Sequence, residues 1–502
     1  MLKLSCLVSL LEKNLLDVKV YSGDNPDRLS LTEVKNLASD SRKVVKGSIF
    51  ACVEGEHSDG HDYAQSVISL GATALLCERR LDVDIPQLIF PDVRKNMGKV
   101  ASLLYGDPAS KLKMIGITGT NGKTTSTFMT KSILENAGLK TGLLGTVWCD
   151  DGVIKENAEH TTPEGSDLQL WLSRMVSNGC DVCVMEASSH AISQGRMNGV
   201  LFDRAGFTNL TVDHLNYHKD MESYFEAKEV LFKKYMRGAW AAAVNIDDLY
   251  GARLYKDFGN STLSYSLFDI NADFFAAIKK TSVEGMEVEI KTPDPKSPFI
   301  AKLPLIGVYN VMNALQALSL SWTLGIEHDV AFEGLSKMRQ VPGRLERYLI
   351  DGGGTCVIDF AHNPDGLEKI LTALRSVCDG KLSVVFGASG ESDTSKRPMM
   401  GEVASRIADH VIISSDNPRS EDPSVIAKEV LLGAKKNSAE CSVIIDREEA
   451  VDFGLGRLKS GDILLLAGKG PETYQILKEG PVTYSDKDAM DGWCRENGRG
   501  YT

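Results

Sequence analysis

The sequence predicts an α/β protein of three domains, and three observations lead to this prediction. The chain has 502 residues, a length typical of about three domains. Short apolar runs alternate with helical segments along most of it, as in parallel sheets covered on both faces. A glycine-rich turn at 119–125 lies between an apolar run and a helix, which is typical of a P-loop mononucleotide-binding domain. We place the domains at 1–111, 112–341 and 342–502.

The elements of the first two domains can be read in order. In the first, apolar strands are expected at 47–55 and 73–78, with helical segments between them. The second domain opens with a strand at 114–119, followed by the turn and a helix at 123–136 that Gly138 ends. The predicted elements that follow are strand 142–147, helix 167–178, strands 181–187 and 204–210, and helix 222–236.

The end of the second domain and the third domain follow different patterns. Residues 262–305 suggest a small β insertion, because 283–292 alternates apolar and polar residues. A helix at 308–325 then closes the second domain. In the third, apolar strands are expected at 356–361, 382–389, 410–416, 441–446 and 462–468, each followed by a loop or helix. This is a Rossmann-like pattern, whose functional residues should lie at the carboxyl ends of the strands.

Composition and charge argue against several classes of protein. With 56 basic and 68 acidic residues the net charge is −12, which argues against binding to nucleic acid or to an anionic membrane. No apolar stretch is long enough to span a bilayer. The N-terminal apolar run is broken by Glu12 and Lys13 and lacks a cleavage site, so we expect a helix there rather than a signal peptide. The scattered cysteines suit a reducing cytoplasm. We interpret Cys180 and Cys183 as a buried, inert pair, the alternative being a redox or metal site.

The glycine-rich turn carries the clearest chemistry. It consists of Gly119, Thr120, Asn121, Gly122, Lys123, Thr124 and Thr125. Backbone N–H groups at a helix start, together with the helix dipole, bind anions. The two glycines would let the backbone approach phosphate, Lys123 would reach the terminal phosphates, and Thr124 would bind Mg²⁺. The general P-loop pattern has a glycine where this chain has Ile117, and an ordinary strand-to-helix turn is the alternative.

Three further residues are candidates on their own chemistry. Glu186 ends an apolar strand, where a carboxylate can hold Mg²⁺, and His214 follows the strand at 204–210. A capping carboxylate and a loop histidine are the alternatives. Lys228, in the helix at 222–236, reads by itself as an exposed lysine.

Taken together, these segments resemble the Mur ligases over nearly the whole chain. GTNGKTT, MEASSHA, TNLTVDHLNYH, YFEAKEVLF, GVYNVMNALQAL, PGRLE and DFAHNPD occur in the family's order and spacing. The chain is most similar to the members that use ATP to add meso-diaminopimelate to UDP-N-acetylmuramoyl-L-alanyl-D-glutamate, through an acyl phosphate, in cytoplasmic peptidoglycan synthesis. The resemblance implies one domain each for the UDP-sugar, ATP and the amino acid, and a monomer is favoured.

The resemblance also implies roles for individual residues. Those implied at the metal, besides Thr124, are Glu186, His214 and a Lys228 that CO₂ converts to a carbamate. Those implied at ATP, besides the turn, are Asn310, Arg344 and His362. Those implied at the UDP-muramoyl peptide are Ser39, Ser41, Glu56, His57, Ser58, Thr161, Thr162, Ser188, Gln194 and Arg196. Those implied at diaminopimelate are Arg397, Asp416, Asn417, Pro418, Arg419, Gly468 and Glu472. The chain departs from many relatives at Pro471, where they have histidine, and at 387–393, where they have a run like GCGGDRD.

Three alternatives remain at this point. A Mur ligase that adds L-lysine would differ at the far end of the amino-acid pocket. A ligase like folylpolyglutamate synthetase shares a similar P-loop but lacks the SDSR, TTPE and DNPR segments seen here. A non-catalytic scaffold that binds nucleotide is disfavoured because Lys123, Glu186, His214 and Lys228 are all present.

Overall fold

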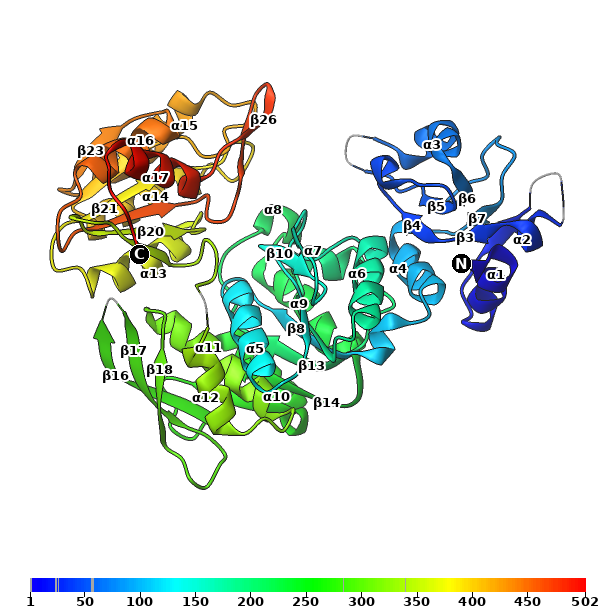
Figure 1. Cartoon of the computed structure of the whole chain (residues 1–502), viewed down its shortest axis with the longest axis horizontal. Helices are drawn as coiled ribbons and strands as arrows, with labels where there is room; N and C mark the ends of the chain where they lie inside the picture. Colours follow the sequence, from blue (N-terminus) through cyan, green and yellow to red (C-terminus); the bar gives the residue numbers. More distant parts are fainter. Residues whose placement is uncertain (1, 23–24, 26, 56–57, 283, 339) are drawn as a thin grey trace. The chain divides into compact units, whose positions relative to one another are not determined.

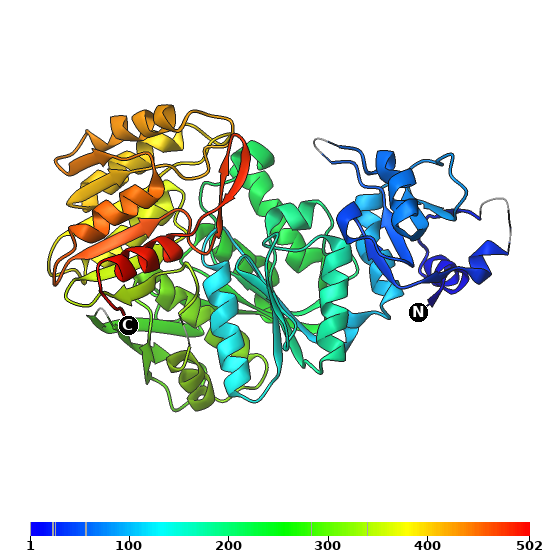
Figure 2. The same ribbon diagram turned by 45° about the horizontal axis from the view of Figure 1, so that its top comes forward.

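The structure is a computed structural model, and its contacts divide the chain into two compact units. The first contains 1–264 and 316–331, and the second contains 265–315 and 332–502 (Figures 1 and 2). The residues described are 2–22, 25, 27–55, 58–282, 284–338 and 340–502. Among them, no helix has both the length and the apolar character needed to cross a bilayer.

The N-terminal part of the first unit is built on a five-stranded sheet. Its order is β2 (Lys19–Tyr21), β7 (Gln87–Ile89), β6 (Ala72–Cys77), β5 (Ser48–Ala51) and β4 (Asn36–Ala38). Strands β4 to β7 are parallel, and β2 is antiparallel to β7. Helices α1 (Leu4–Lys13) and α4 (Val93–Leu104) place apolar side chains in one core with β5 and β6. The predicted N-terminal helix and the two predicted strands are therefore confirmed.

The central part of the first unit is a larger, mostly parallel sheet. Up to residue 245 its strands follow the order β11 (Lys155–Asn157), β10 (Trp148–Asp150), β9 (Thr141–Leu144), β12 (Val182–Glu186), β8 (Lys113–Thr118), β13 (Phe202–Phe207) and β14 (Met236–Asn245). The predicted helices appear as α5 (Lys123–Asn136), α6 (Gly165–Ser177) and α9 (Met221–Lys234). Strand β8, which precedes the glycine-rich turn, lies between β12 and β13. The ends of these three strands can therefore bring the P-loop, Glu186 and the loop of His214 together.

The cysteine pair lies in this part of the chain. Cys183 lies in β12 and Cys180 shortly before it, and both are free and buried. Burial raises the pKa of both thiols, which favours the protonated form over the reactive thiolate. The predicted burial of the pair is confirmed.

The second unit contains the predicted β insertion and a six-stranded sheet. Strands β16 (Phe274–Ser282), β17 (Gly285–Lys291) and β18 (Phe299–Leu303) form an antiparallel meander. The sheet has the order β19 (Glu346–Leu349), β20 (Thr355–Asp359), β24 (Ile463–Ala467), β21 (Leu382–Phe386), β22 (His410–Ile413) and β23 (Glu440–Val443). Neighbouring strands of this sheet are parallel, except that β19 is antiparallel to β20. All five strands predicted for the third domain are present.

Helices cover both faces of this second sheet, as its apolar strands predict. Leu465 packs in one core with α13 (Pro364–Arg375), α14 (Lys396–Ile407) and α15 (Pro423–Ala434). Its neighbours Leu464 and Leu466 pack on the opposite face with α16 (Arg447–Gly456) and α17 (Asp486–Glu496). Because successive strand residues point to opposite faces, a strand buried on both sides must be apolar throughout. This arrangement confirms the predicted Rossmann-like character.

Candidate active site

The glycine-rich turn has the geometry of a phosphate-binding loop. It joins the end of β8 at Thr118 to the start of α5 at Lys123. Gly119 has φ 142°, and a Cβ there would come within 1.9 Å of Thr208 Oγ1. Gly122 has φ 88°. Both glycines are therefore required by the backbone conformation, and the alternative of an ordinary turn is disfavoured.

The loop after β13 holds the turn in place. Thr208 Oγ1 donates to Asn121 O at 2.6 Å, and Asn121 N donates to Asn209 Oδ1 at 3.0 Å. Thr120 Oγ1 donates to the Tyr224 hydroxyl of α9 at 3.3 Å. The sequence analysis assigned these supporting residues no role. Thr208 and Asn209 nevertheless begin the TNLTVDHLNYH motif, and Tyr224 begins the YFEAKEVLF motif. They fix the loop before any ligand binds.

Two lysines converge on the carbonyl of Gly119. Lys123 Nζ donates to Gly119 O at 3.0 Å and Lys228 Nζ donates to it at 2.9 Å. Lys228 is 1% exposed and lies 4.4 Å from the centre of the Tyr224 ring, so its interpretation as an exposed lysine is wrong. Burial, and then the nearby Lys123, hold the pKa of Lys228 well below its ordinary value, against the opposing effect of Asp213. Burial thus shifts the equilibrium of Lys228 toward its neutral amine form.

Glu186 lies at the end of β12 with its carboxylate already positioned. Its Oε1 accepts from Thr146 N at 2.8 Å, and its Oε2 accepts from Thr146 Oγ1 at 3.1 Å. The same hydroxyl oxygen lies 3.1 Å from Thr161 Oγ1. Glu186 is 1% exposed, and Thr124 and Thr125 are buried in the first turn of α5. A buried carboxylate that accepts hydrogen bonds stays oriented for a cation.

His214 occupies a strained loop position among aromatic side chains. It has φ 55° and its side chain is 46% exposed. Its ring meets that of His190 edge-on at 4.8 Å. Burial, and then His190, Lys123 and Lys228, lower the pKa of His214 to about 4, although Asp213 opposes this. A neutral imidazole is the form that binds metals. Within the described part of the chain, no group of at least three His, Cys, Asp or Glu side chains is arranged to hold a metal ion.

The residues predicted for the muramoyl peptide lie together beside Glu186. Thr162 Oγ1 donates to Glu186 O at 2.7 Å and accepts from Ser188 N at 3.1 Å. Arg196 donates through Nη1 to Thr162 O at 3.1 Å, and through Nε to Gln194 Oε1 at 2.9 Å. Thr162 and the segment 186–196 thus form one polar cluster.

The other residues predicted at the UDP-muramoyl peptide, which lie between 39 and 58, are less closely associated. Ser39 Oγ lies 3.2 Å from Ser166 Oγ at the start of α6. Ser41 begins a short 3₁₀ helix capped by Asp40, and Ser58 O accepts from Gly55 N at 2.8 Å. Glu56 and His57 lie outside the described residues. The structure therefore brings Thr162, Ser188, Gln194 and Arg196 together more clearly than the predicted residues near the N-terminus.

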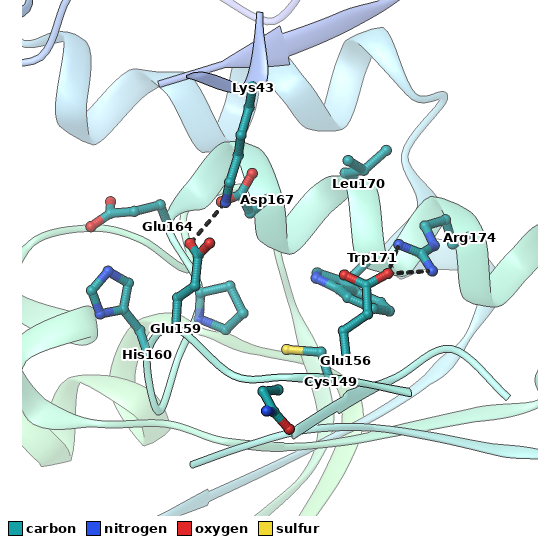
Figure 3. Close-up of a pocket in the computed structure, with 12 residues that line it drawn as sticks. Lys43, Cys149, Glu156, Glu159, His160, Glu164, Asp167, Leu170, Trp171 and Arg174 are labelled. Atoms are coloured by element: carbon teal, nitrogen blue, oxygen red, sulfur yellow. Dashed lines mark hydrogen bonds and ion pairs between the residues drawn. The ribbon is translucent and has the colours of Figure 1, made fainter. Parts of the chain in front are cut away.

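A cavity of about 180 Å³ adjoins the peptide cluster (Figure 3). Its lining includes His160 and Glu164, which flank the two threonines, and Lys43 from the N-terminal part. Lys43 Nζ pairs with Glu159 at 2.8 Å and with Asp167 at 3.0 Å. Ligand pockets usually have volumes of about 300–1,000 Å³, so this cavity does not hold a nucleotide sugar by itself.

In the second unit, two of the residues predicted to bind ATP, Arg344 and His362, lie next to Phe360. The Arg344 guanidinium lies 4.8 Å from the centre of its ring, and the His362 ring meets it edge-on at 4.8 Å. Asn310 is buried in α11 (Val308–Trp322), where its Nδ2 donates to Ile306 O at 2.8 Å. Arg344 and His362 thus share one site, whereas Asn310 supports the start of a helix.

The loop after β22 carries the run Asp416–Arg419. Asn417 Oδ1 accepts from Ile476 N at 2.9 Å, which confirms that this side chain fixes the loop. The divergent run 387–393 packs against it, because Gly390 N donates to Asn417 O at 2.9 Å. The Arg419 side chain is half exposed, and its Nη1 lies 3.8 Å from Glu391 Oε2. Its guanidinium can therefore reach a ligand.

The loop after β24 lies beside the first. A Cβ at Gly468 would come within 2.8 Å of Asp416 Oδ2. Lys469 is fully buried and donates to Glu472 Oε2 at 2.6 Å and to Asn417 Oδ1 at 3.0 Å. A Cβ at Gly343 would lie 2.3 Å from Pro471 N. Pro471, one of the two departures from the family pattern, therefore packs on the loop of Arg344.

Arg397 is placed differently from the other predicted pocket residues. It is 1% exposed, and its guanidinium pairs with Glu421 and with Glu429, each at 2.9 Å. The side chain is therefore committed to holding α14 against the chain around α15.

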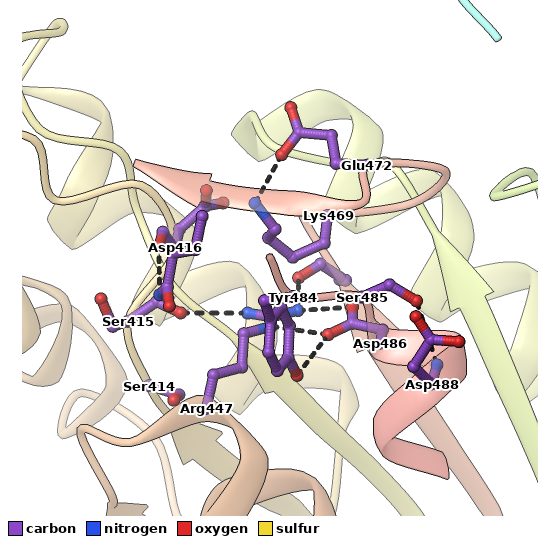
Figure 4. A network of polar contacts seen from close by, with 12 residues as sticks. Ser414, Ser415, Asp416, Arg447, Lys469, Glu472, Tyr484, Ser485, Asp486 and Asp488 are labelled. Carbon is purple, nitrogen blue, oxygen red and sulfur yellow. Dashed lines mark hydrogen bonds and ion pairs between the residues drawn. The ribbon is translucent and has the colours of Figure 1, made fainter. Parts of the chain in front are cut away.

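A buried ion pair lies beneath the two loops (Figure 4). Arg447 and Asp486 are both 0% exposed and form two hydrogen bonds of 2.8 Å. Arg447 Nη2 also donates to Ala467 O at 2.8 Å and Nη1 to Ser415 O at 3.4 Å. These carbonyls immediately precede Gly468 and Asp416. Sequence reasoning missed both members of the pair, and no motif indicates them.

Comparisons with known proteins agree with this geometry. Family models described as the Mur ligase family catalytic domain, the Mur ligase middle domain and the Mur ligase glutamate ligase domain match residues 33–103, 117–321 and 343–470. The chain is 40% identical over 469 residues to UDP-N-acetylmuramoyl-L-alanyl-D-glutamate–2,6-diaminopimelate ligase 1 of Clostridium acetobutylicum, covering 92% of this chain and 95% of that protein. It is 42% identical over 467 residues to the ligase of Synechococcus elongatus, covering 91% and 93%. A solved structure of such a ligase has a TM-score of 0.65 at 30% identity, covering 95% and 97%.

Proposed function

The chain belongs to the Mur ligase family, and on this premise we propose that it uses ATP to add meso-diaminopimelate to UDP-N-acetylmuramoyl-L-alanyl-D-glutamate. The identity to diaminopimelate ligases over more than nine-tenths of the chain carries the proposal. It favours this activity over the addition of L-lysine, over a folylpolyglutamate synthetase and over a non-catalytic scaffold. Peptidoglycan synthesis in the cytoplasm, by a monomer, follows as part of the same proposal.

The chemistry requires an activated carboxylate. A free carboxylate does not react with an amine, because oxide is a poor leaving group. The D-glutamyl γ-carboxylate oxygen therefore attacks the γ-phosphorus of ATP, ADP leaves, and an acyl phosphate forms. The unprotonated amine of diaminopimelate then attacks the acyl carbon, and phosphate leaves as the amide forms. Lys123 and the loop N–H groups lower the energy of the transferring phosphoryl group through positioning and charge.

The donor set supports Mg²⁺ binding once Lys228 is modified. Glu186 and Thr124 offer hard oxygen ligands, and His214 offers a neutral nitrogen. An ammonium ion cannot bind a cation, but the neutral Lys228 amine can add to CO₂ and release a proton, which leaves a carbamate. The lowered pKa of Lys228 favours this step, because only the neutral amine adds to CO₂. Bound Mg²⁺ would neutralise phosphate charge, while Thr146 keeps the Glu186 carboxylate oriented.

The remaining assignments follow the same division of the chain. We propose that 1–111, 112–341 and 342–502 serve the UDP-sugar, ATP and the amino acid, and one matched family model falls in each range. The peptide cluster around Thr162 and Arg196 then holds the dipeptide next to Glu186. Arg419 binds the distal carboxylate that distinguishes diaminopimelate from lysine, because a planar guanidinium suits a carboxylate.

The test is ligation by the purified protein. UDP-N-acetylmuramoyl-L-alanyl-D-glutamate and ATP are incubated with meso-diaminopimelate or L-lysine, and the product is identified by mass spectrometry. We expect the diaminopimelate product and phosphate release that needs all substrates. Arg419→Ala should reduce diaminopimelate use roughly 30- to 1,000-fold, the cost of losing a bidentate charged contact. A wild-type preference for lysine would contradict the specificity, and no ligation at all would contradict the function.

A further inference from the structure

Lys469 is a buried cation with all of its hydrogens used. Its side chain is 0% exposed, in the loop after β24. The ammonium donates to Glu472 Oε2 at 2.6 Å, to Tyr474 O at 2.6 Å and to Asn417 Oδ1 at 3.0 Å. An ammonium carries three N–H groups, so no hydrogen remains for a ligand. Lys469 therefore cannot act by touching the substrate.

The acceptors of Lys469 connect two separate loops. Glu472 and Tyr474 follow β24, whereas Asn417 follows β22. Asn417 also bonds Glu472 directly, because its Nδ2 donates to Glu472 Oε2 at 3.2 Å. The three side chains form a closed triangle, in which each member restrains the other two. One buried charge thus contributes to the geometry of both loops.

The triangle determines which part of Glu472 a ligand can use. Both hydrogen bonds end on Oε2, and Oε1 takes part in none of the hydrogen bonds among the described residues. The Glu472 side chain is 19% exposed, so part of it reaches the surface. On the same loop as Asn417, Arg419 is 47% exposed. One free carboxylate oxygen and one guanidinium are therefore presented from two loops that Lys469 ties together.

We infer that Lys469 is a positioning residue for binding of the amino acid, because together with Asn417 it holds the Glu472 carboxylate in the orientation that accepts the distal ammonium of the substrate. The inference rests on the proposed function, in which Glu472 and Asn417 belong to the diaminopimelate pocket. It adds a residue that does not contact the substrate but decides where the contacting oxygen lies. Without Lys469, the Glu472 carboxylate would turn toward water, since burying an unpaired charge is costly.

The first experiment compares Lys469→Met with wild type. Methionine has a similar length and no charge, so the cavity stays filled. We expect KM for meso-diaminopimelate to rise roughly 10- to 100-fold, as for a misplaced contact, while KM for ATP and for the UDP-muramoyl dipeptide stays unchanged. Lys436→Met is the matched control, because Lys436 pairs with Glu402 on the exposed surface. It should behave as wild type.

A double-mutant cycle separates positioning from general support. If Lys469 acts through Glu472, then adding Lys469→Met to Glu472→Gln should raise KM for meso-diaminopimelate by about twofold or less. Additive effects, or an equal loss for all three substrates with a lower Tm, would overturn the inference. If Lys469→Met does not fold, Lys469→Gln, which keeps a hydrogen-bond donor, replaces it. If neither variant folds, Lys469 has a structural role, and this result also overturns the inference. A wild type that does not ligate diaminopimelate would instead contradict the proposed function.

Discussion

Replacing Arg447 by methionine should destabilise the second unit by about 3–5 kcal/mol, the usual cost of removing one partner of a buried ion pair. The structure explains the size of this effect. Arg447 is fully buried and makes two hydrogen bonds to Asp486 and one to Ala467 O, all at 2.8 Å. Burial lowers the pKa of Arg447, but the Asp486 carboxylate outweighs this and keeps the guanidinium charged. After the substitution Asp486 remains buried, with Tyr484 Oη as a hydrogen-bond donor at 3.0 Å but no counter-charge.

The assay is urea unfolding followed by circular dichroism, with Arg447→Met, Asp486→Leu and the double variant. Removing both charges should recover most of the stability lost in either single variant, because the uncompensated charge disappears. Arg406→Met is the control, since Arg406 and Glu368 are an exposed pair and should give no measurable change. Two results would refute this account of the pair. One is a single variant whose free energy of unfolding is within about 1 kcal/mol of the wild-type value, and the other is a double variant less stable than both single variants.

Three further predictions concern the first unit. Lys123→Ala should reduce phosphate release by roughly 10²–10³-fold with the fold intact. Near-normal phosphate release by a folded variant would contradict the role of Lys123 at the phosphates. Lys228→Ala should lose most activity, and Lys228→Glu should recover part of it by restoring a negative oxygen ligand; equal inactivity of both would argue against the carbamate. Burial, and then His190 and Lys228, lower the pKa of His218 to about 4, whereas the unfolded chain binds this proton near pH 6.5. The unfolded state thus binds more protons between these values, so stability should fall as the pH drops from about 6.5 to about 4. Urea unfolding at pH 7 and pH 5 should show a smaller pH effect in His218→Gln than in wild type, and an unchanged effect would contradict the prediction.

The sequence by itself determined the class of fold and the position of the phosphate loop. Strands such as β24 are continuous apolar runs because both of their faces are buried, and this property is visible in adjacent residues. The glycine-rich turn is equally local, since the strand, the glycines and the helix that create an anion site follow one another along the chain. The resemblance to the Mur ligases added roles for Glu186, His214 and Lys228 that their local chemistry left open.

Only the tertiary structure decided how these side chains are paired and charged. Lys228 reads as an exposed lysine from its neighbours, yet packing of α9 against the loop buries it beside Gly119 and lowers its pKa. Arg447 and Asp486, and likewise Lys469 and Asn417, come from different loops and helices. Such pairs depend on the register of parallel strands and on which face each helix covers. Burial and the electric field around a charge are properties of the assembled chain, and local sequence patterns therefore do not reveal them.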